Sequence, residues 1–291
     1  MKAHQTDHNK QFRKARSLMG FRLAAFADEA SGELTGQIKA MHDNGISRLE
    51  IRGVDGTNIA DITENKAREI RKRLDDEGIS VWSLGSPYGK ITMNDDFTPH
   101  LESFRRALEN AHILGCRHIR MFSFYEWEGR KSEVFDRLAQ FVRASEGEDI
   151  ILCHENEKGI YGDIASRCLE IHRELPEIKA IFDPANFIQS DQDTLEAWEL
   201  LNPYVEYMHI KDALSDGSVV PAGKGMGHLP YLLSEYKGEV LTVEPHLTVF
   251  DGLDKLESGE KTKINPYSYP DSFTAFKAAC DALKSLTTQI S

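Results

Sequence analysis

Apolar and polar positions along the chain follow two different periods in turn. Short apolar or β-branched runs, which are typical of buried strands, alternate with longer stretches whose apolar residues recur every three or four positions, as in amphipathic helices. From Arg22 onward this unit repeats roughly every thirty residues. The pattern predicts eight strands: Arg22–Ala27, Arg48–Arg52, Ile79–Leu84, His118–Phe122, Ile150–His154, Ala180–Phe182, Val205–His209 and Val240–Val243.

Helices are predicted between these strands and after the last one. They include Thr63–Glu77, Pro99–Leu114, Ser132–Ala144, Ile164–Leu175, Thr194–Leu201 and Ser272–Leu286. Several of their ends carry the expected signals. Thr63 can accept hydrogen bonds from free backbone amides at the start of its helix, and Gly78 and Gly115 can adopt the left-handed conformation that ends theirs.

Strands and helices joined in this order favour an α/β fold of one domain. Short connections between strand, helix and strand produce a parallel sheet with right-handed crossovers, and eight such units favour closure into a (β/α)8 TIM barrel. An open, doubly wound sheet is the alternative. Against it, no strand precedes a G-x-G-x-x-G turn, and the glycine-rich run at residues 223–227 lacks the helix start that a phosphate-binding loop requires.

Two segments fall outside the repeating units. Residues 1–20 carry five basic side chains against one acidic one and few apolar residues, so we expect a flexible N-terminal arm. The barrel domain then spans residues 21–291. Residues 247–270 form the longest connection, a polar loop after the eighth strand, and we expect it at the carboxyl face of the barrel, where long loops cover a site or meet a partner subunit.

The composition of the chain indicates its cellular compartment and the class of its binding partners. The four cysteines are scattered without a C-x-x-C pair, and the chain has no secretory leader, so we expect free thiols in the cytoplasm. No apolar run approaches the roughly 20 residues that cross a bilayer. The formal net charge of −12 repels phosphate backbones and anionic membranes. A small molecule or a metal cation is therefore the expected partner, rather than nucleic acid or a membrane.

Four consecutive strands end in a residue that can bind a metal. Side chains alternate between the two faces of a strand, so the last residue on the inward face can be identified for each strand. These residues are Glu155, Asp183, His209 and Glu244. A barrel gathers its strand tips around one axis, which would bring the four together at the carboxyl mouth.

The chemistry of this set predicts a metal centre. Three carboxylates so close repel one another unless a divalent cation or protonation compensates their charge. Carboxylates with a single imidazole suit Mn²⁺, Mg²⁺ or Co²⁺ better than a structural zinc, although Zn²⁺ is possible. We therefore expect one divalent ion with open coordination positions.

At these positions the sequence resembles the sugar isomerase/epimerase group of xylose-isomerase-like TIM barrels, which also contains endonuclease IV-type enzymes and inosose dehydratases. The resemblance covers most of the chain after Gly20. The order of five short motifs carries it: His154-Glu-Asn156, Phe182-Asp-Pro-Ala-Asn186, Met208-His-Ile-Lys-Asp212, Pro221-Ala-Gly-Lys-Gly225 and Thr242-Val-Glu-Pro245. It implies that Glu155, Asp183, His209 and Glu244 hold one divalent ion. It also implies that Glu155 and Glu244 flank the substrate as catalytic proton carriers.

Asn186 and Lys211 are predicted to bind substrate. Family members that epimerise ketoses usually have a histidine three residues after the aspartate of the sixth strand, where this chain has Asn186. Asparagine offers an amide to a hydroxyl or a metal-bound water, but it does not titrate near neutral pH. Lys211 resembles the His-x-Lys-Asp signature of inositol-related members, in which a lysine can polarise a carbonyl. Lys211 could equally neutralise the acidic mouth.

Other polar residues near strand tips are weaker candidates. His246 shares the parity of Glu244 but lies beyond Pro245, so it could donate to substrate or fall outside the site. Glu50 and Arg52 on the second strand could line the site and bind hydroxyls, or could be plain surface residues.

The leading hypothesis is reversible proton transfer on a carbon next to a carbonyl, in a ketose, aldose or inosose. A divalent ion chelated by the carbonyl and a neighbouring hydroxyl would lower the cost of an enediolate, while one glutamate removes the proton and the other returns it. Return to the same carbon from the opposite face epimerises, and return to the adjacent carbon isomerises. Elimination of a β-hydroxyl would make the protein an inosose-type dehydratase. The sequence does not separate these outcomes.

Two other classes remain as hypotheses. An endonuclease IV-like hydrolase would need several metals, more imidazoles and a basic surface. The negative net charge of the chain argues against this hypothesis. A non-catalytic sugar-binding barrel is the second, and Asn186 leaves it open. A homodimer is also possible, since barrels with long carboxyl-face loops often pair.

Overall fold

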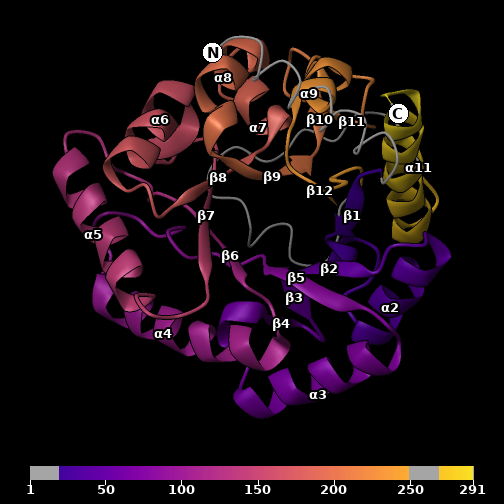
Figure 1. Cartoon of the computed structure of the whole chain (residues 1–291), viewed down its shortest axis with the longest axis horizontal. Helices are drawn as coiled ribbons and strands as arrows, with labels where there is room; N and C mark the ends of the chain where they lie inside the picture. The colour runs from indigo at the N-terminus through magenta and orange to yellow at the C-terminus, as the bar shows by residue number, and fades with distance from the viewer. Residues whose placement is uncertain (1–19, 249–268, 291) are drawn as a thin grey trace, which may run out of the picture.

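In the computed structural model, which describes residues 20–248 and 269–290, eight parallel strands close into a barrel (Figure 1). The strands are β1 (Arg22–Ala25), β2 (Arg48–Ile51), β5 (Ser80–Leu84), β6 (His118–Met121), β7 (Ile151–Glu155), β8 (Lys179–Phe182), β9 (Val205–Ile210) and β12 (Val240–Val243). Their order around the barrel is β1-β12-β9-β8-β7-β6-β5-β2. The fold is therefore a single-domain TIM barrel, as the alternating pattern predicts, and all eight predicted strands are present.

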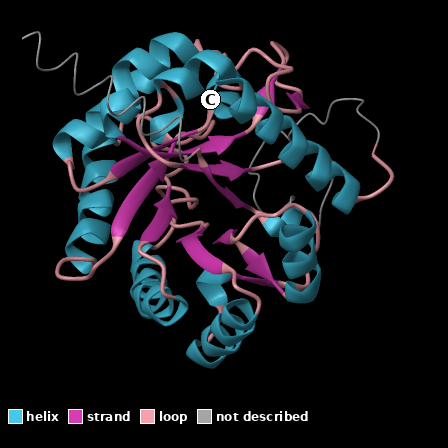
Figure 2. Cartoon of the chain, turned by 45° about the vertical axis from the view of Figure 1, so that its right-hand side comes forward, coloured by secondary structure: helices cyan, strands magenta, loops and turns pink. Residues whose placement is uncertain are grey.

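Helices surround the strands, as the cyan ring around the magenta barrel in Figure 2 shows. They are α2 (Leu34–Asp43), α3 (Glu64–Asp76), α4 (Phe97–Leu114), α5 (Lys131–Ala144), α6 (Ala165–Glu174), α7 (Pro184–Ile188), α8 (Thr194–Leu201), α9 (Leu229–Glu235) and α11 (Ser272–Ile290). The last helix packs against both α9 and α2 and so closes the ring. Two predicted helix ends are confirmed: the Thr63 hydroxyl accepts a hydrogen bond from the backbone N–H of Lys66, and Gly115 ends α4 with φ of 70°.

Shorter elements lie in the loops. They are the two-residue strands β3 (Gly53–Val54), β4 (Thr57–Asn58), β10 (Asp212–Ala213) and β11 (Val219–Val220), and the 3-10 turns η1 (Ala27–Glu29), η2 (Ile59–Asp61), η3 (Tyr161–Asp163) and η4 (Asn202–Tyr204).

Side-chain parity divides the core into an outer layer between strands and helices and a small inner cluster within the barrel. The inner cluster contains Ala24, Cys153, Ile181, Tyr207 and Val240. Because alternate residues of a strand share a face, the predicted strand tips lie at inward positions further along β7, β8, β9 and β12. Val205 departs from the parity of Tyr207: it packs with the outer layer, because the pairing of β8 with β9 shifts register after Ala180.

Other expectations have different outcomes. All four cysteines are buried and free, as predicted. The predicted arm over residues 1–20 and the predicted loop over residues 247–270 lie outside the described residues, apart from the few at their edges. Among the residues that the structure describes, no helix combines the length and the apolar character needed to span a membrane.

The loop after β9 is folded around one carboxylate. Asp212 accepts hydrogen bonds from four backbone N–H groups, those of Ala213, Gly223, Gly225 and Gly227, each at 2.9 Å. A Cβ atom on Gly225 would lie 2.3 Å from the Asp212 carboxylate, so only glycine allows this approach. Asp212 thereby fixes the loop that follows Lys211.

The glycine-rich run has a different role from the one that its sequence suggested. The prediction that no helix start follows it was wrong, because α9 begins at Leu229. Nevertheless, the amides of Gly223, Gly225 and Gly227 already donate to the Asp212 carboxylate. These amides are therefore not available to cradle a phosphate group.

A second contact holds the loop after β5. His100 on α4 accepts a hydrogen bond at Nε2 from the backbone N–H of Gly89, at 2.8 Å, so its imidazole is neutral in the folded chain. Burial, together with the charge of Arg137, lowers the pKa of His100 from 6.5 to about 4. The unfolded chain consequently takes up a proton at a higher pH than the folded chain does.

We predict that replacing Asp212 with Asn lowers the free energy of unfolding by about 2–3 kcal/mol. An amide NH₂ would face two backbone N–H groups that lose their acceptor. Chemical denaturation measures this loss, and hydrogen exchange at Gly223, Gly225 and Gly227 should accelerate. The matched control is Asp216→Asn in the same loop, where the carboxylate accepts from the Ser218 N–H at a more exposed position. Equal stability of the Asp212 and Asp216 variants would contradict the assigned role of Asp212.

The fold should lose stability in acid through His100. Because the folded pKa lies below the unfolded value, the loss begins as pH falls below about 6.5 and is complete near pH 4. His100→Gln keeps an acceptor for Gly89 but does not titrate. The stability difference between pH 7 and pH 4.5, measured by urea denaturation, should therefore be about 2 kcal/mol smaller in the variant than in the wild type. An unchanged difference would show that His100 does not contribute to acid sensitivity.

Candidate functional site

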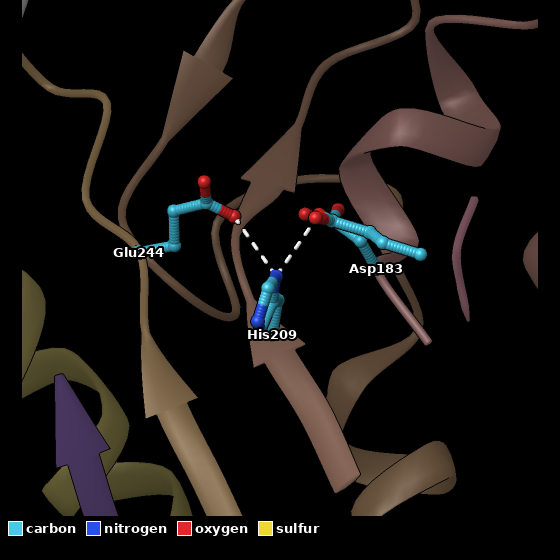
Figure 3. Close-up of side chains that lie close together, drawn as sticks. Asp183, His209 and Glu244 are labelled. Atoms are coloured by element: carbon cyan, nitrogen blue, oxygen red, sulfur yellow. Dashed lines mark hydrogen bonds and ion pairs between the residues drawn. The ribbon is translucent and has the colours of Figure 1, made fainter. Parts of the chain in front are cut away.

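The four predicted strand tips meet at the carboxyl mouth of the barrel. Glu155 ends β7, Asp183 follows β8, His209 lies on β9 and Glu244 follows β12. Each offers one ligand atom, and these four atoms all lie within 4.8 Å of one another. All four residues are buried, with exposed fractions of 0–3%. Figure 3 shows Asp183 and Glu244 on either side of the imidazole of His209.

His209 lies at the centre of the cluster, between carboxylates on both sides. Its Nδ1 atom is 2.9 Å from Glu155 Oε1 and 3.4 Å from Glu244 Oε2. Its Nε2 atom is 3.2 Å from Glu50 Oε2. Burial alone would lower the pKa of His209, but Glu155 and Glu50 outweigh it and raise that pKa well above the usual value.

Glu50 lies behind the imidazole and is fully buried. One of its oxygens accepts from the hydroxyl of Tyr207 at 2.8 Å, and the other accepts from that of Thr242, also at 2.8 Å. Since both oxygens are bonded to protein groups, we interpret Glu50 as a residue that orients His209, in place of the substrate contact that the sequence suggested. A carboxylate on the far nitrogen of a metal-binding histidine is the usual way of fixing its tautomer.

The donor set fits a divalent cation. If Glu50 takes the Nε2 proton, the Nδ1 lone pair faces Glu155 and Glu244, and that arrangement is favourable only with a cation between these groups. The alternative is protonation. Burial, aided by Glu244 and Glu155 and opposed by Lys211, raises the pKa of Asp183 to about 8. Three carboxylate ligands and one imidazole would suit Mn²⁺, Mg²⁺ or Co²⁺.

Lys211 and Asn186 both lie within the cluster. The Lys211 ammonium is 3.0 Å from Asp183 Oδ2 and 3.3 Å from Glu244 Oε2. The Asn186 amide donates to Glu155 Oε1 at 3.3 Å, and the Asn186 backbone N–H donates to Asp183 Oδ1 at 3.0 Å. Lys211 and Asn186 therefore each contact two of the four predicted ligands.

His246 adjoins the cluster on the side of Glu244. Its Nε2 atom is 3.4 Å from Glu244 Oε1 and 3.4 Å from Glu29 Oε1. Its backbone has φ of 43°, a left-handed conformation that costs energy for a residue other than glycine, and its N–H donates to Glu29 Oε2 at 2.6 Å. Glu29, Glu244 and His246 could themselves hold an ion. The guanidinium of Arg52, however, already lies 3.2 Å from Glu29 and 3.4 Å from Glu244.

The structure also brings in residues that the sequence did not point to. Arg120 contacts Glu155 Oε2 at 3.2 Å, and Asp28 and Glu29 hold Arg52. Arg120 offered a signal, because it lies in the middle of a buried strand, where an arginine is unusual without a partner. Asp28 and Glu29 belong to the turn η1, which has no strand periodicity to give their direction.

Comparison with known proteins agrees with the barrel fold. A family profile described as "Xylose isomerase-like TIM barrel" matches residues 38–242. No curated protein sequence matches the chain.

Similar solved structures share the fold at low sequence identity. An L-ribulose 3-epimerase has 17% identity and a TM-score of 0.71, covering 93% of this chain and 95% of that one. The IOLI protein with a bound zinc atom has 16% identity and a TM-score of 0.69, covering 93% and 99%. The probable 3-DHS dehydratase AsbF from Bacillus anthracis has 16% identity and a TM-score of 0.67, covering 91% and 99%. The family profile matches more than half of this chain, so the chain belongs to the xylose isomerase-like TIM barrel family.

Proposed function

We propose that this chain is a divalent-metal-dependent sugar isomerase or epimerase, which moves a proton on a carbon next to the carbonyl of a ketose, aldose or inosose. One observation carries the proposal. Glu155 and Glu244 come from strands separated by β8 and β9, yet both carboxylates lie within 3.4 Å of the same imidazole nitrogen. Two carboxylates that converge in this way can act on the two faces of one substrate.

The proposed ligands are Glu155, Asp183, His209 and Glu244. A bound Mn²⁺, Mg²⁺ or Co²⁺, or alternatively Zn²⁺, would supply the Lewis acidity that stabilises negative charge on the carbonyl oxygen. The support is the donor set itself, three carboxylates and one imidazole buried together. Related folds described with zinc and with magnesium are compatible with an ion of this class.

The two glutamates would carry the proton. Burial opposes the charge of Glu155, but His209 and Arg120 outweigh burial and lower its pKa to about 2. Burial likewise opposes the charge of Glu244, but Lys211 and His246 outweigh it and lower that pKa well below the usual value. Both carboxylates are therefore ionised at neutral pH and able to act as bases. One would remove the proton from the substrate carbon, and the other, after taking up a proton from solvent, would return one to the substrate.

Lys211, Asn186 and His246 would bind the substrate. Lys211 would donate to the carbonyl oxygen, because its ammonium lies among the proposed ligands and stays charged. Burial would lower the pKa of Lys211, but Asp183 and Glu244 raise it. Asn186 and His246 would contact hydroxyls. Accordingly, we expect a sugar or polyol-derived substrate, with no role for nucleic acid or a membrane, in a cytoplasmic protein that can form a homodimer.

A dehydratase is the second candidate. A lysine beside the carboxylate pair could stabilise an enediolate long enough for a β-hydroxyl to leave. The fold of this chain also resembles that of a probable 3-DHS dehydratase. Elimination differs from proton return in its product, so the two candidates are separable by one assay.

We predict that Glu155→Gln and Glu244→Gln each lower turnover by about 10³-fold, because removal of a general base costs about 10²–10⁴-fold. The measurement is ¹H NMR of Mn²⁺-loaded protein with a panel of ketoses and inososes in D₂O. Wild-type protein should place deuterium beside the carbonyl of its substrate. A dehydratase would instead generate an unsaturated carbonyl product.

The matched control is Glu206→Gln. Glu206 lies on β9 at the opposite, amino end of the barrel and pairs with His118, so its variant should keep wild-type exchange. Substantial residual exchange in either the Glu155 or the Glu244 variant would contradict the proton-carrier assignment. Ligand binding by the wild type without exchange into any substrate would favour a non-catalytic barrel.

A further inference from the structure

Part of the mouth is lined by alternating cations and aromatic rings that lie on β6, directly after β1, β2 and β6, and in the loop after β5. Lys90 Nζ lies 4.4 Å from the ring centre of Phe122, and the guanidinium carbon of Arg120 lies 5.0 Å from the same ring. On its other side Arg120 lies 5.0 Å from the ring of Phe26, and Arg52 lies 4.5 Å from that ring. We call these five residues the cation–aromatic row. Contacts of this kind hold a cation in place over a ring face.

Each cation of the row also contacts an acid at the mouth. The pairs are Lys90 with Glu157 at 2.8 Å, Arg120 with Glu155 at 3.2 Å, and Arg52 with Glu244 at 3.4 Å. Two of the three acids are the proposed proton carriers. Each proposed proton carrier therefore has its own arginine, and both arginines pack on the single ring of Phe26.

Arg120 fixes one oxygen of Glu155. Arg120 is 3% exposed. Its guanidinium lies near the rings of Phe26 and Phe122 and donates through Nη2 to the carbonyl of Gly85 at 2.9 Å. Its Nη1 donates to Glu155 Oε2. With Oε2 held in this way, Oε1 is the oxygen that lies 2.9 Å from His209 Nδ1.

Arg52 does the same for Glu244 from the other side. Two of its nitrogens donate to Asp28, at 2.9 and 3.1 Å, and one also donates to Glu29 at 3.2 Å. The remaining Nη1 lies 3.4 Å from Glu244 Oε1. The other oxygen, Oε2, is the one that lies 3.4 Å from His209.

We propose that Arg120 and Arg52 are positioning residues, which turn one oxygen each of Glu155 and Glu244 toward His209, with Phe26 fixing the two guanidiniums relative to each other. The inference rests on the proposed function, because it concerns the same two glutamates. A lysine would keep the charge but would lose the planar fork and the stacking that hold the carboxylate in one orientation. Replacing each arginine with lysine therefore separates the effect of its positive charge from its effect on the orientation of the glutamate.

The test compares Arg120→Lys and Arg52→Lys with wild-type full-length protein. The first measurement is Mn²⁺ affinity by isothermal titration calorimetry, which needs no substrate. We expect affinity to fall at least about tenfold in Arg120→Lys, as is typical when a group that orients a ligand is lost. The effect in Arg52→Lys should be smaller, because Arg52 contacts Glu244 at the longer distance. In the second measurement, kcat and KM are determined separately at saturating Mn²⁺. We expect kcat to fall in the two arginine variants and KM to change little.

The matched control is Arg137→Lys. Arg137 also packs near two rings, Phe97 at 5.2 Å and Phe124 at 5.4 Å, but it donates to backbone carbonyls of the loop at residues 92–95. This variant should therefore lose some thermal stability and keep wild-type Mn²⁺ affinity. If one of the test variants fails to fold, the other carries the test, because the two arginines hold different glutamates.

Two results would overturn the inference in distinguishable ways. If Arg120→Lys and Arg52→Lys bind Mn²⁺ as Arg137→Lys does, while Glu155→Gln loses affinity, the arginines do not position the ligands and the proposed function stands. If Glu155→Gln and Glu244→Gln also keep wild-type Mn²⁺ affinity, the glutamates are not ligands. The proposed metal centre and the role of the arginines then fail together.

Discussion

Mutual repulsion among Glu155, Asp183 and Glu244 is the constraint on which the mouth of this barrel depends. Removing a carboxylate from water costs several kcal/mol, and burying three within 4.8 Å of one another adds their repulsion. Positive groups accordingly converge on the same place. Lys211 contacts two of the three acids, and Arg120 and Arg52 contact one each. A divalent cation would complete this compensation, which is the reason for proposing a metal centre at this cluster.

The fold maintains this arrangement through links between neighbouring strands. Beyond the ladder of β7 and β8, the side chain of Asn156 donates to the carbonyl of Asp183 at 3.0 Å and accepts from its N–H at 2.9 Å. Asn186 reaches back to Glu155, and Asp212 fixes the loop after Lys211. Each predicted ligand is thus held by more than its own strand. Such rigidity matters because catalytic groups must keep their mutual geometry while substrate binds.

Much of the fold and the convergence of the four strand tips could be predicted from the sequence, because both follow from local periodicity. Alternation along β7, β8, β9 and β12 gave the inward direction of Glu155, Asp183, His209 and Glu244, and closure of the barrel gave their convergence. Periodicity fails where a strand is irregular, as at Val205 beside the shift in register. It also fails where partners come from distant segments. Glu50 is hydrogen-bonded to groups on β9 and β12. The sequence around Glu50 does not show whether its carboxylate is buried against those strands or exposed at the mouth of the barrel. Arg120 was missed for the same reason, since its partner lies on the next strand of the barrel.

The most direct test of the central claim, that four strand tips form one divalent metal centre, is elemental analysis of purified protein after loading with Mn²⁺ and dialysis. The account predicts one tightly held ion per chain in the wild type, and none after His209→Ala, because His209 contributes the one nitrogen of the donor set. Two or more ions per chain would point to a multinuclear hydrolytic site of the endonuclease type. No retained ion in the wild type would contradict the account. The lysine and arginine side chains at the mouth would then compensate the charge of its carboxylates without a metal.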